Sequence, residues 1–402
     1  MEGSVGNGKI GQSGFGLYIH WPFCRSKCPY CDFNSHVEGV VDHVRWAKAL
    51  ISELDHIADD IGRRSLSSIF FGGGTPSLMA PATAGSLIER AVDRFGVEPD
   101  LEITLEANPT SAEKERLADF KAAGVNRLSL GVQSLDDDAL RFLGREHRVD
   151  EALNAVNHAA RLFDRFSFDL IYARPEQSLD DWDRELSNAL DYADGHLSVY
   201  QLTIEQGTRF YNLHQKGALK LPDDDLQADL FDLTQERLSK AGLPAYEISN
   251  HAAPGQACRH NLTYWLAGDY AGIGPGAHGR LTIDGQRFST QTERMPRAWL
   301  DTVDRNGHGE QPRKSLDVWD QVVEMVLMGL RTSVGVDIHR LERLSGRPLF
   351  ETLNDEALGR FVEEDWLRFN DGKLAAGNEG FLRLNAILSA LLDRQEERLM
   401  DD

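Results

Sequence analysis

The chain alternates short apolar runs with segments of helical periodicity from residue 17 to about residue 240. Each apolar run is rich in β-branched or large side chains and is followed by turn-forming residues, which is typical of a buried strand. The runs predict six strands, at residues 17–20, 68–71, 101–106, 127–131, 166–171 and 197–204. Amphipathic segments predict helices at residues 41–61, 111–123, 149–163, 179–193 and 226–241.

Repeated strand–helix units place helices outside a parallel sheet. We therefore predict an α/β fold built on a partial (β/α)6 barrel. Because the active sites of such barrels gather at the carboxyl ends of the strands, the residues just after each predicted strand are the first candidates for chemistry.

The pattern changes after Gly242, and we divide the chain accordingly. We expect residues 1–16 to form a flexible N-terminal tail, 17–243 the barrel, 244–311 a loop-rich extension that contains the run HNLTYW, and 312–402 a small, mainly helical C-terminal domain. Within that last domain we expect helices at 318–330, 337–345, 353–365 and 381–392, and a strand pair at 367–369 and 373–374.

Composition narrows the choice of partners. Lys and Arg number 43 against 64 Asp and Glu, a formal net charge of −21, which argues against nucleic acid or an anionic membrane as the main partner. No apolar stretch approaches the ~20 residues that span a bilayer, so we expect no transmembrane segment. The polar, Gly-rich start lacks the apolar core of a signal peptide, and we expect a cytoplasmic protein with reduced cysteines.

Cys24, Cys28 and Cys31 lie just after the first predicted strand, in the run CRSKCPYC. Three thiolates can hold three corners of a cubane iron–sulfur cluster and leave one iron open for chemistry. A zinc site completed by His20 or His36 is the alternative, although zinc motifs favour paired C-x2-C spacings. A disulfide is a weaker alternative, because the chain has only 4 cysteines and no sign of export.

A run of three glycines follows the second predicted strand, in FGGGTPS from Phe71 to Ser77. Glycines such as Gly73 and Gly74, with Thr75 after them, expose backbone N–H and C=O groups to a ligand because no Cβ stands in the way. Taken alone, the run could equally be a tight turn.

Polar residues also follow or lie within the later strands. Glu106 ends the third strand, Gln133 follows the fourth, Arg145 lies in the next helix–loop region, and Asp169 lies within the fifth strand. A carboxylate could accept from an ammonium or a ribose hydroxyl, and Arg suits a carboxylate bidentately. Each of these residues could instead serve in structural pairing, since a buried charge needs a partner.

The C-x3-C-x2-C spacing resembles the cluster motif of radical S-adenosylmethionine (SAM) enzymes. The surrounding run YIHWPFCRSKCPYCDFNSH, residues 18–36, resembles one branch of them, which holds the oxygen-independent coproporphyrinogen III oxidases and the HemW-type haem chaperones. The runs YQLTIE, HNLTYW and GFLRLN extend the resemblance to about residue 392.

The resemblance implies a radical SAM barrel in which the three cysteines bind a [4Fe–4S] cluster and SAM chelates its fourth iron. It also implies that a reduced cluster can pass one electron to SAM, so an electron donor is an expected partner. The residues that it assigns to SAM are Tyr18, Tyr30, Gly73, Gly74, Thr75, Glu106 and Asp169. We add Gln133 and Arg145 from their chemistry, because an amide suits a polar ligand and a guanidinium suits the methionyl carboxylate or a porphyrin propionate.

Two absences favour the chaperone branch. The oxidases usually carry a further cysteine two residues after the third, and this chain has Phe33 at that position. They also tend to have a long extension before the first strand, whereas 17 residues precede Tyr18 here. The resemblance then implies that haem is a ligand and that haem-accepting proteins are partners. Haem needs an axial ligand, and we expect His260, with Cys258 and His278 as weaker candidates.

Three hypotheses therefore stand: a haem chaperone with a SAM cluster, an oxygen-independent coproporphyrinogen III oxidase or other radical SAM enzyme of porphyrin metabolism, and a zinc-binding scaffold. We expect no decarboxylation of coproporphyrinogen. One departure from the family pattern is Ala173-Arg174-Pro175, where Gly-Leu-Pro is expected. Arg174 could pair with a haem propionate, but we favour a simple loop variation.

Overall fold

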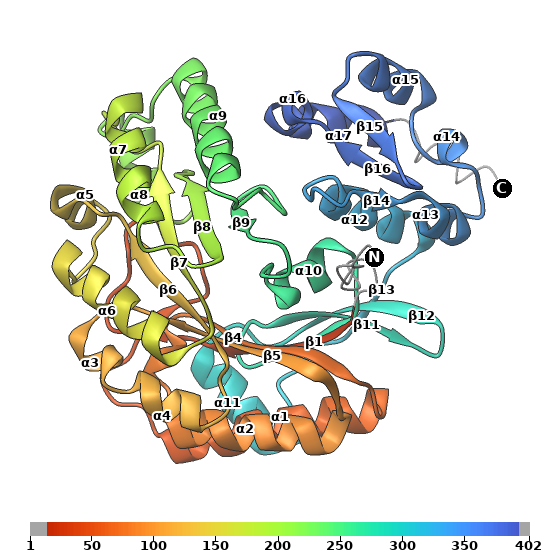
Figure 1. Ribbon diagram of the computed structural model, residues 1–402. Helices are drawn as coiled ribbons and strands as arrows, with labels where there is room; N and C mark the ends of the chain where they lie inside the picture. The colour runs from red at the N-terminus through yellow and green to blue at the C-terminus, as the bar shows by residue number, and fades with distance from the viewer. Residues whose placement is uncertain (1–13, 394–402) are drawn as a thin grey trace, which may run out of the picture.

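The computed structural model describes residues 14–393, and its largest element is a curved sheet of eleven strands (Figure 1). Six adjacent strands of this sheet run parallel and match the six predicted ones: β1 (Phe15–Trp21), β4 (Leu66–Gly73), β5 (Val97–Ala107), β6 (Arg127–Gln133), β7 (Arg165–Tyr172) and β8 (His196–Gln201). Only the last ends early, at Gln201 rather than at residue 204. The predicted α/β fold with a partial barrel is confirmed.

The segment after the barrel is more regular than its loop-rich sequence predicts. It adds β10 (Tyr270–Ile273) parallel to β1, and then β11 (His278–Ile283), β12 (Gln286–Gln291) and β13 (Lys314–Ser315), each antiparallel to its neighbour. At the other edge β9 (Asn250–Ala252) pairs antiparallel with β8. Our expectation of loops was wrong because these strands are short and are stabilised by pairing with distant residues.

Helices cover the convex side of the sheet. The predicted helices appear as α1 (His43–Ile61), α6 (Val149–Leu162), α7 (Leu179–Leu190) and α9 (Asp224–Lys240), whereas the expected helix at 111–123 is divided into α3 (Ser111–Lys114) and α4 (Leu117–Ala122). Helices that we did not predict are α2 (Pro81–Phe95), α5 (Asp137–Phe142), α8 (Arg209–Gln215), α10 (Arg259–Trp265) and α11 (Pro296–Asn306). Figure 1 shows α1, α2 and α11 together on the outer side of the sheet.

The main apolar core lies between the sheet and these outer helices. Leu17 and Ile19 of β1 and Leu50 and Leu54 of α1 have no exposed surface. Leu50 and Leu54 are one helical turn apart, so they lie on the same face of α1 and bury it against the strands. Figure 1 shows α10 on the concave side of the sheet.

The C-terminal region has an apolar cluster of its own. It holds α12 (Val318–Gly329), α13 (Ile338–Ser345), α14 (Leu349–Thr352), α15 (Asp355–Glu363), α16 (Asn378–Leu382) and α17 (Leu384–Leu392), with a small sheet of β14 (Val336–Asp337), β15 (Leu367–Asn370) and β16 (Lys373–Ala376). The expected strand pair is confirmed, and the expected final helix is divided into α16 and α17. The predicted tail lies mostly outside the described residues, as do residues 394–402.

Candidate functional site

The three clustered cysteines lie in the segment that leaves β1. Cys24 ends the short strand β2 (Phe23–Cys24), and Cys28 and Cys31 form a turn in which the Cys31 N–H donates to the Cys28 carbonyl at 3.2 Å. All three thiols are free and partly exposed. The segment, which we call the cysteine loop (residues 24–35), is anchored because the Asn34 side-chain amide donates to the Pro275 carbonyl at 2.9 Å.

Hydrogen-bond donors contact the cysteine sulfurs. The Thr75 hydroxyl donates to Cys24 Sγ at 3.4 Å, and Arg145 Nη1 donates to Cys28 Sγ at 3.4 Å. The Ser35 hydroxyl lies 3.9 Å from Cys31 Sγ. Burial raises the pKa of Cys24 and of Cys31, while the hydroxyl groups of Thr75 and Ser35 act in the opposite sense by favouring the thiolate. These donors suit sulfurs that bind a metal as thiolates.

A cavity of about 330 Å³ opens beside the cysteine loop, at the carboxyl ends of the parallel strands. It is lined by the three cysteines and by most of the predicted SAM residues: Tyr30, Gly73, Gly74, Thr75, Glu106, Gln133, Arg145 and Asp169. Parallel strands bring their carboxyl ends to one edge of a sheet, which is why residues far apart in the sequence meet here. The volume is in the range of pockets that bind small molecules.

The glycine run is required by packing as well as by the cavity. The Gly74 N–H donates to the Trp21 carbonyl at 2.7 Å, and the Thr75 N–H donates to the Phe23 carbonyl at 2.8 Å. A Cβ on Gly74 would lie 2.7 Å from the Phe23 carbonyl oxygen. The run therefore holds the end of β4 against the chain that enters the cysteine loop, a role that we did not predict from the sequence.

Two carboxyl groups in the cavity have raised pKa values. Burial, and secondly the charge of Asp169, raise the pKa of Glu106 to about 8. Burial also raises the pKa of Asp169 to about 6, although hydrogen bonds from Ser198 and Ser129 and the charges of Arg127 and Arg145 oppose the shift. A cationic ligand beside these groups would favour their ionised forms, so the cavity suits a ligand that carries an ammonium or sulfonium group.

Arg145 connects two of the strand ends to the cysteine loop. Besides Cys28, it donates to the Gly131 carbonyl at 2.8 Å and to Asn108 Oδ1 at 2.5 Å. The Asn108 amide in turn donates to the Thr75 hydroxyl at 3.1 Å. One chain of hydrogen bonds therefore links the donor to Cys24 Sγ with the donor to Cys28 Sγ. We did not predict a role for Asn108; its position two residues after Glu106 at a strand end was the available signal.

Gln133 lines the cavity with φ of 74°, a left-handed conformation that non-glycine residues seldom adopt. Such a backbone is maintained only where the surroundings hold it, and it is often found at functional sites. It occurs at the register shift between β6 and β7.

Two predicted site residues do not line the cavity. Tyr18 lies on the concave side of the sheet, where its hydroxyl bonds to His20 Nδ1 at 3.0 Å and its ring stacks on Phe70. His260 in α10 is 1% exposed, and both ring nitrogens have partners: Nδ1 accepts from or donates to the Ser68 hydroxyl at 2.8 Å, and Nε2 bonds the Tyr264 hydroxyl. Burial lowers the pKa of His260 to about 3. The structure therefore gives His260 no free nitrogen for haem iron.

The weaker haem-ligand candidates also lie away from the cavity lining. Cys258 is buried, and its thiol donates to Glu102 Oε1 at 3.4 Å. His278 is exposed on β11. Arg174 does not line the cavity either: it is 7% exposed and pairs with Glu185 of α7. Its partner is thus inside the protein and is not a propionate.

Comparisons with known proteins agree with this geometry. A family model described as the radical SAM superfamily matches residues 18–187, and one described as the HemN C-terminal domain matches residues 316–383. The haem chaperone HemW of Escherichia coli (strain K12) is 37% identical over 94% of this chain and 97% of its own length. This chain belongs to the HemW-type family of radical SAM proteins.

Another relative and a solved structure are also similar to this HemW-type protein over most of its length. The mitochondrial radical S-adenosyl methionine domain-containing protein 1 of Bos taurus is 39% identical over 95% of this chain and 88% of the relative. Among solved structures, E. coli coproporphyrinogen III oxidase (HemN), a radical SAM enzyme, superposes with a TM-score of 0.77 over 95% of this chain and 91% of its own, at 22% identity. That likeness shows that the barrel has the radical SAM fold. None of the helices within residues 14–393 is long and apolar enough to cross a membrane.

Proposed function

We propose that this protein is a haem chaperone that binds haem and a [4Fe–4S] cluster with SAM and transfers haem to acceptor proteins. The observation that carries the proposal is the meeting of three free cysteines with a polar cavity at the strand ends, in a chain whose curated relatives include haem chaperones.

The cysteine loop fits a cluster better than a single zinc ion. Tetrahedral zinc holds thiolates at about 2.3 Å, which places the sulfurs roughly 3.8 Å from one another. In the part of the chain that the structure describes, the three cysteine sulfurs do not form a group within 4.8 Å of one another. A cubane, whose three ligated irons are separate atoms, accommodates wider spacing. Cys24, Cys28 and Cys31 would hold it.

The cavity beside the loop would hold SAM. Glu106 and Asp169 supply carboxyl groups for the ammonium and the ribose hydroxyls, and Arg145 supplies a guanidinium for the methionyl carboxylate. Tyr30, Gln133 and the backbone of residues 73–75 would complete the contacts. A reduced cluster supplies one electron to bound SAM, so the chaperone would need an electron donor. Tyr18 stays a prediction, as does a cytoplasmic location.

Phe33 separates the chaperone proposal from the oxidase alternative. The Phe33 side chain lines the cavity mouth and is 60% exposed, where the oxidases usually carry a further cysteine. An exposed aromatic ring offers an apolar surface to a flat ligand such as haem. The loss of one cysteine removes a hallmark of the oxidases, so we expect no decarboxylation of coproporphyrinogen.

The test is an anaerobic haem titration of the protein reconstituted with iron and sulfide. We expect about one haem per chain, SAM-dependent changes in the cluster spectrum, and no protoporphyrinogen when coproporphyrinogen is supplied. Replacing Cys24, Cys28 and Cys31 by Ala should abolish iron and sulfide binding. Cys258→Ala is the matched control and should retain the cluster, because Cys258 lies away from the cavity lining.

Each alternative has a distinct outcome in this experiment. Protoporphyrinogen in the assay would establish the oxidase. Zinc in place of iron and sulfide would establish the scaffold. Failure to bind haem with an intact cluster would refute the chaperone while leaving the radical SAM assignment in place.

A further inference from the structure

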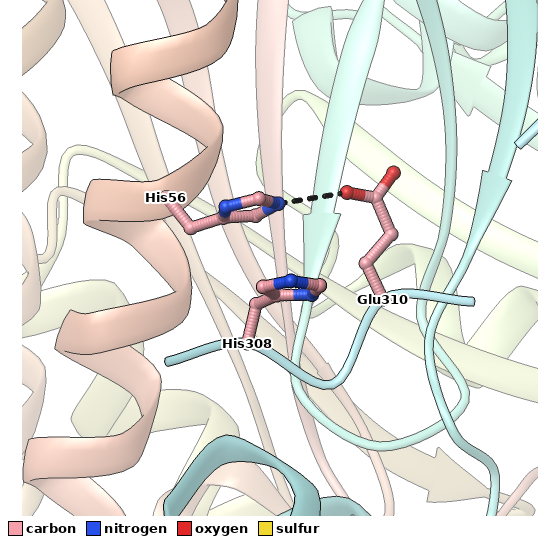
Figure 2. Close-up of side chains that lie close together, drawn as sticks. All are labelled: His56, His308 and Glu310. Carbon is pink, nitrogen blue, oxygen red and sulfur yellow. Dashed lines mark hydrogen bonds and ion pairs between the residues drawn. The ribbon is translucent and has the colours of Figure 1, made fainter. Parts of the chain in front are cut away.

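A second group of metal-ligating side chains lies on the outer side of the barrel, separate from the cysteine loop. His56 of α1, His308 and Glu310 point toward one another (Figure 2), and one ligand atom from each lies within 4.8 Å of the other two. His56 Nε2 is 3.1 Å from Glu310 Oε2, and the two imidazole rings stack with centroids 3.8 Å apart.

Two hydrogen bonds hold the segment around His308 against α1, the helix that carries His56. One turn before His56 on α1, the Ser52 hydroxyl donates to the Gly307 carbonyl at 2.8 Å. The next residue, Glu53, is fully buried and accepts from the Gly309 N–H at 2.7 Å. These two bonds fix the residues on either side of His308 against α1. The imidazole rings of His56 and His308 stack face to face, so one ring must rotate for both to bind one ion.

His308 has an unused ligand atom. Within residues 14–393, its Nδ1 is buried and has no hydrogen-bond partner. A buried polar atom without a partner is costly and needs an explanation. Imidazole nitrogens are common zinc ligands, so a metal ion would give this atom a partner.

We propose that His56, His308 and Glu310 form a zinc site that joins α1 to the segment after α11. Two histidines and one carboxylate are a common zinc donor set, and they leave a fourth position for water. Ligand atoms on tetrahedral zinc lie about 3.3 Å apart, close to the 3.1 Å between His56 Nε2 and Glu310 Oε2. A zinc ion would thus replace this hydrogen bond with little movement of either side chain.

Arg313 orients the carboxylate of the proposed site. It donates to Glu310 Oε1 at 2.6 Å and to Oε2 at 2.9 Å, and it also pairs with Asp60. Ligating carboxylates are commonly held in this way by a neighbouring donor. Zinc needs only one oxygen of Glu310, so Arg313 can keep the other, while Asp60 offsets its positive charge.

Zinc binding to the full-length chain tests the proposal. Free cysteine thiols are competing zinc ligands in general, so the titration uses wild-type protein with its cluster reconstituted and, separately, the chain with Cys24, Cys28 and Cys31 replaced by Ala. In both we expect one zinc per chain with nitrogen and oxygen ligands by X-ray absorption, and a rise in the unfolding temperature. His56→Gln and His308→Gln should each weaken binding by at least about 10-fold.

His158→Gln on α6 is the matched control and should bind zinc as the parent does. Glu310→Gln gives an independent variant that keeps the side-chain volume, and it should also weaken binding. Equal affinity in the parent and the three site variants would overturn the proposal. So would sulfur in the zinc shell of the chain that lacks the three cysteines, because Cys258 would then be the ligand. Circular dichroism confirms that each variant is folded.

Discussion

The pairing of Arg174 with Glu185 makes a quantitative prediction about stability. Both side chains are 7–8% exposed, and Arg174 donates to the two carboxylate oxygens of Glu185 at 2.5 and 3.2 Å. Removing one partner of a buried ion pair costs about 3–5 kcal/mol, because the other charge is left buried. After Arg174→Met, the Ser134 hydroxyl and the Leu135 N–H still donate to Glu185. We therefore expect the lower end, about 3 kcal/mol.

The assay is urea unfolding followed by circular dichroism. With a slope of about 3 kcal/mol/M or more for a chain of this size, the loss moves the midpoint by up to about 1 M. Glu185→Gln combined with Arg174→Met removes both charges and should cost about 1 kcal/mol, roughly 2 kcal/mol less than Arg174→Met alone. Arg184→Met, which breaks an exposed pair with Asp181 on the same helix, should cost less than about 1 kcal/mol.

A loss below about 1 kcal/mol for Arg174→Met, or a double variant less stable than Arg174→Met, would refute the pairing as the reason for this arginine. Haem binding should be unchanged in Arg174→Met, because the residue does not line the cavity. A large loss of haem affinity without a loss of stability would instead support a propionate contact.

Three further predictions follow from the site. The pKa of Glu106 is raised to about 8 in the folded protein, so its contribution to the stability of the ligand-free protein is full below pH 4.5 and is lost as the pH rises through 8. Thermal unfolding of Glu106→Gln, measured against pH, should lack this pH-dependent contribution. Parallel pH profiles of the wild type and the variant would contradict the prediction. His260→Ala should retain haem affinity but lose about 2–4 kcal/mol of unfolding free energy, because the substitution leaves the Ser68 hydroxyl without its partner and opens a cavity. Loss of haem binding in a folded variant would instead identify His260 as a haem ligand. Gly74→Ala should lower the iron content after reconstitution, since its Cβ would lie 2.7 Å from the Phe23 carbonyl oxygen; full iron content would show that the cysteine loop tolerates the shift.

Much of the barrel could be predicted because its signals are local. Each of the six parallel strands is a short apolar run followed by turn residues, and burial on both faces makes such runs easy to detect. By contrast, β10 has only 4 residues, and it forms because β1 pairs with it across more than 240 residues of sequence. The break that divides the expected helix at 111–123 into α3 and α4 was not predicted, because no sequence signal marks it.

The sequence by itself determined where the candidate chemistry lies. The cysteine spacing is local, and Gly73, Glu106 and Gln133 lie at the ends of strands whose carboxyl ends must meet in a parallel sheet. Only the tertiary structure decided which polar side chains are free. His260 is engaged by Ser68, 192 residues away, and Arg174 by Glu185 on the next helix. His56 meets Glu310 across 254 residues. Periodicity reports which face of an element is buried, but the partner that a buried polar group finds depends on packing between distant segments.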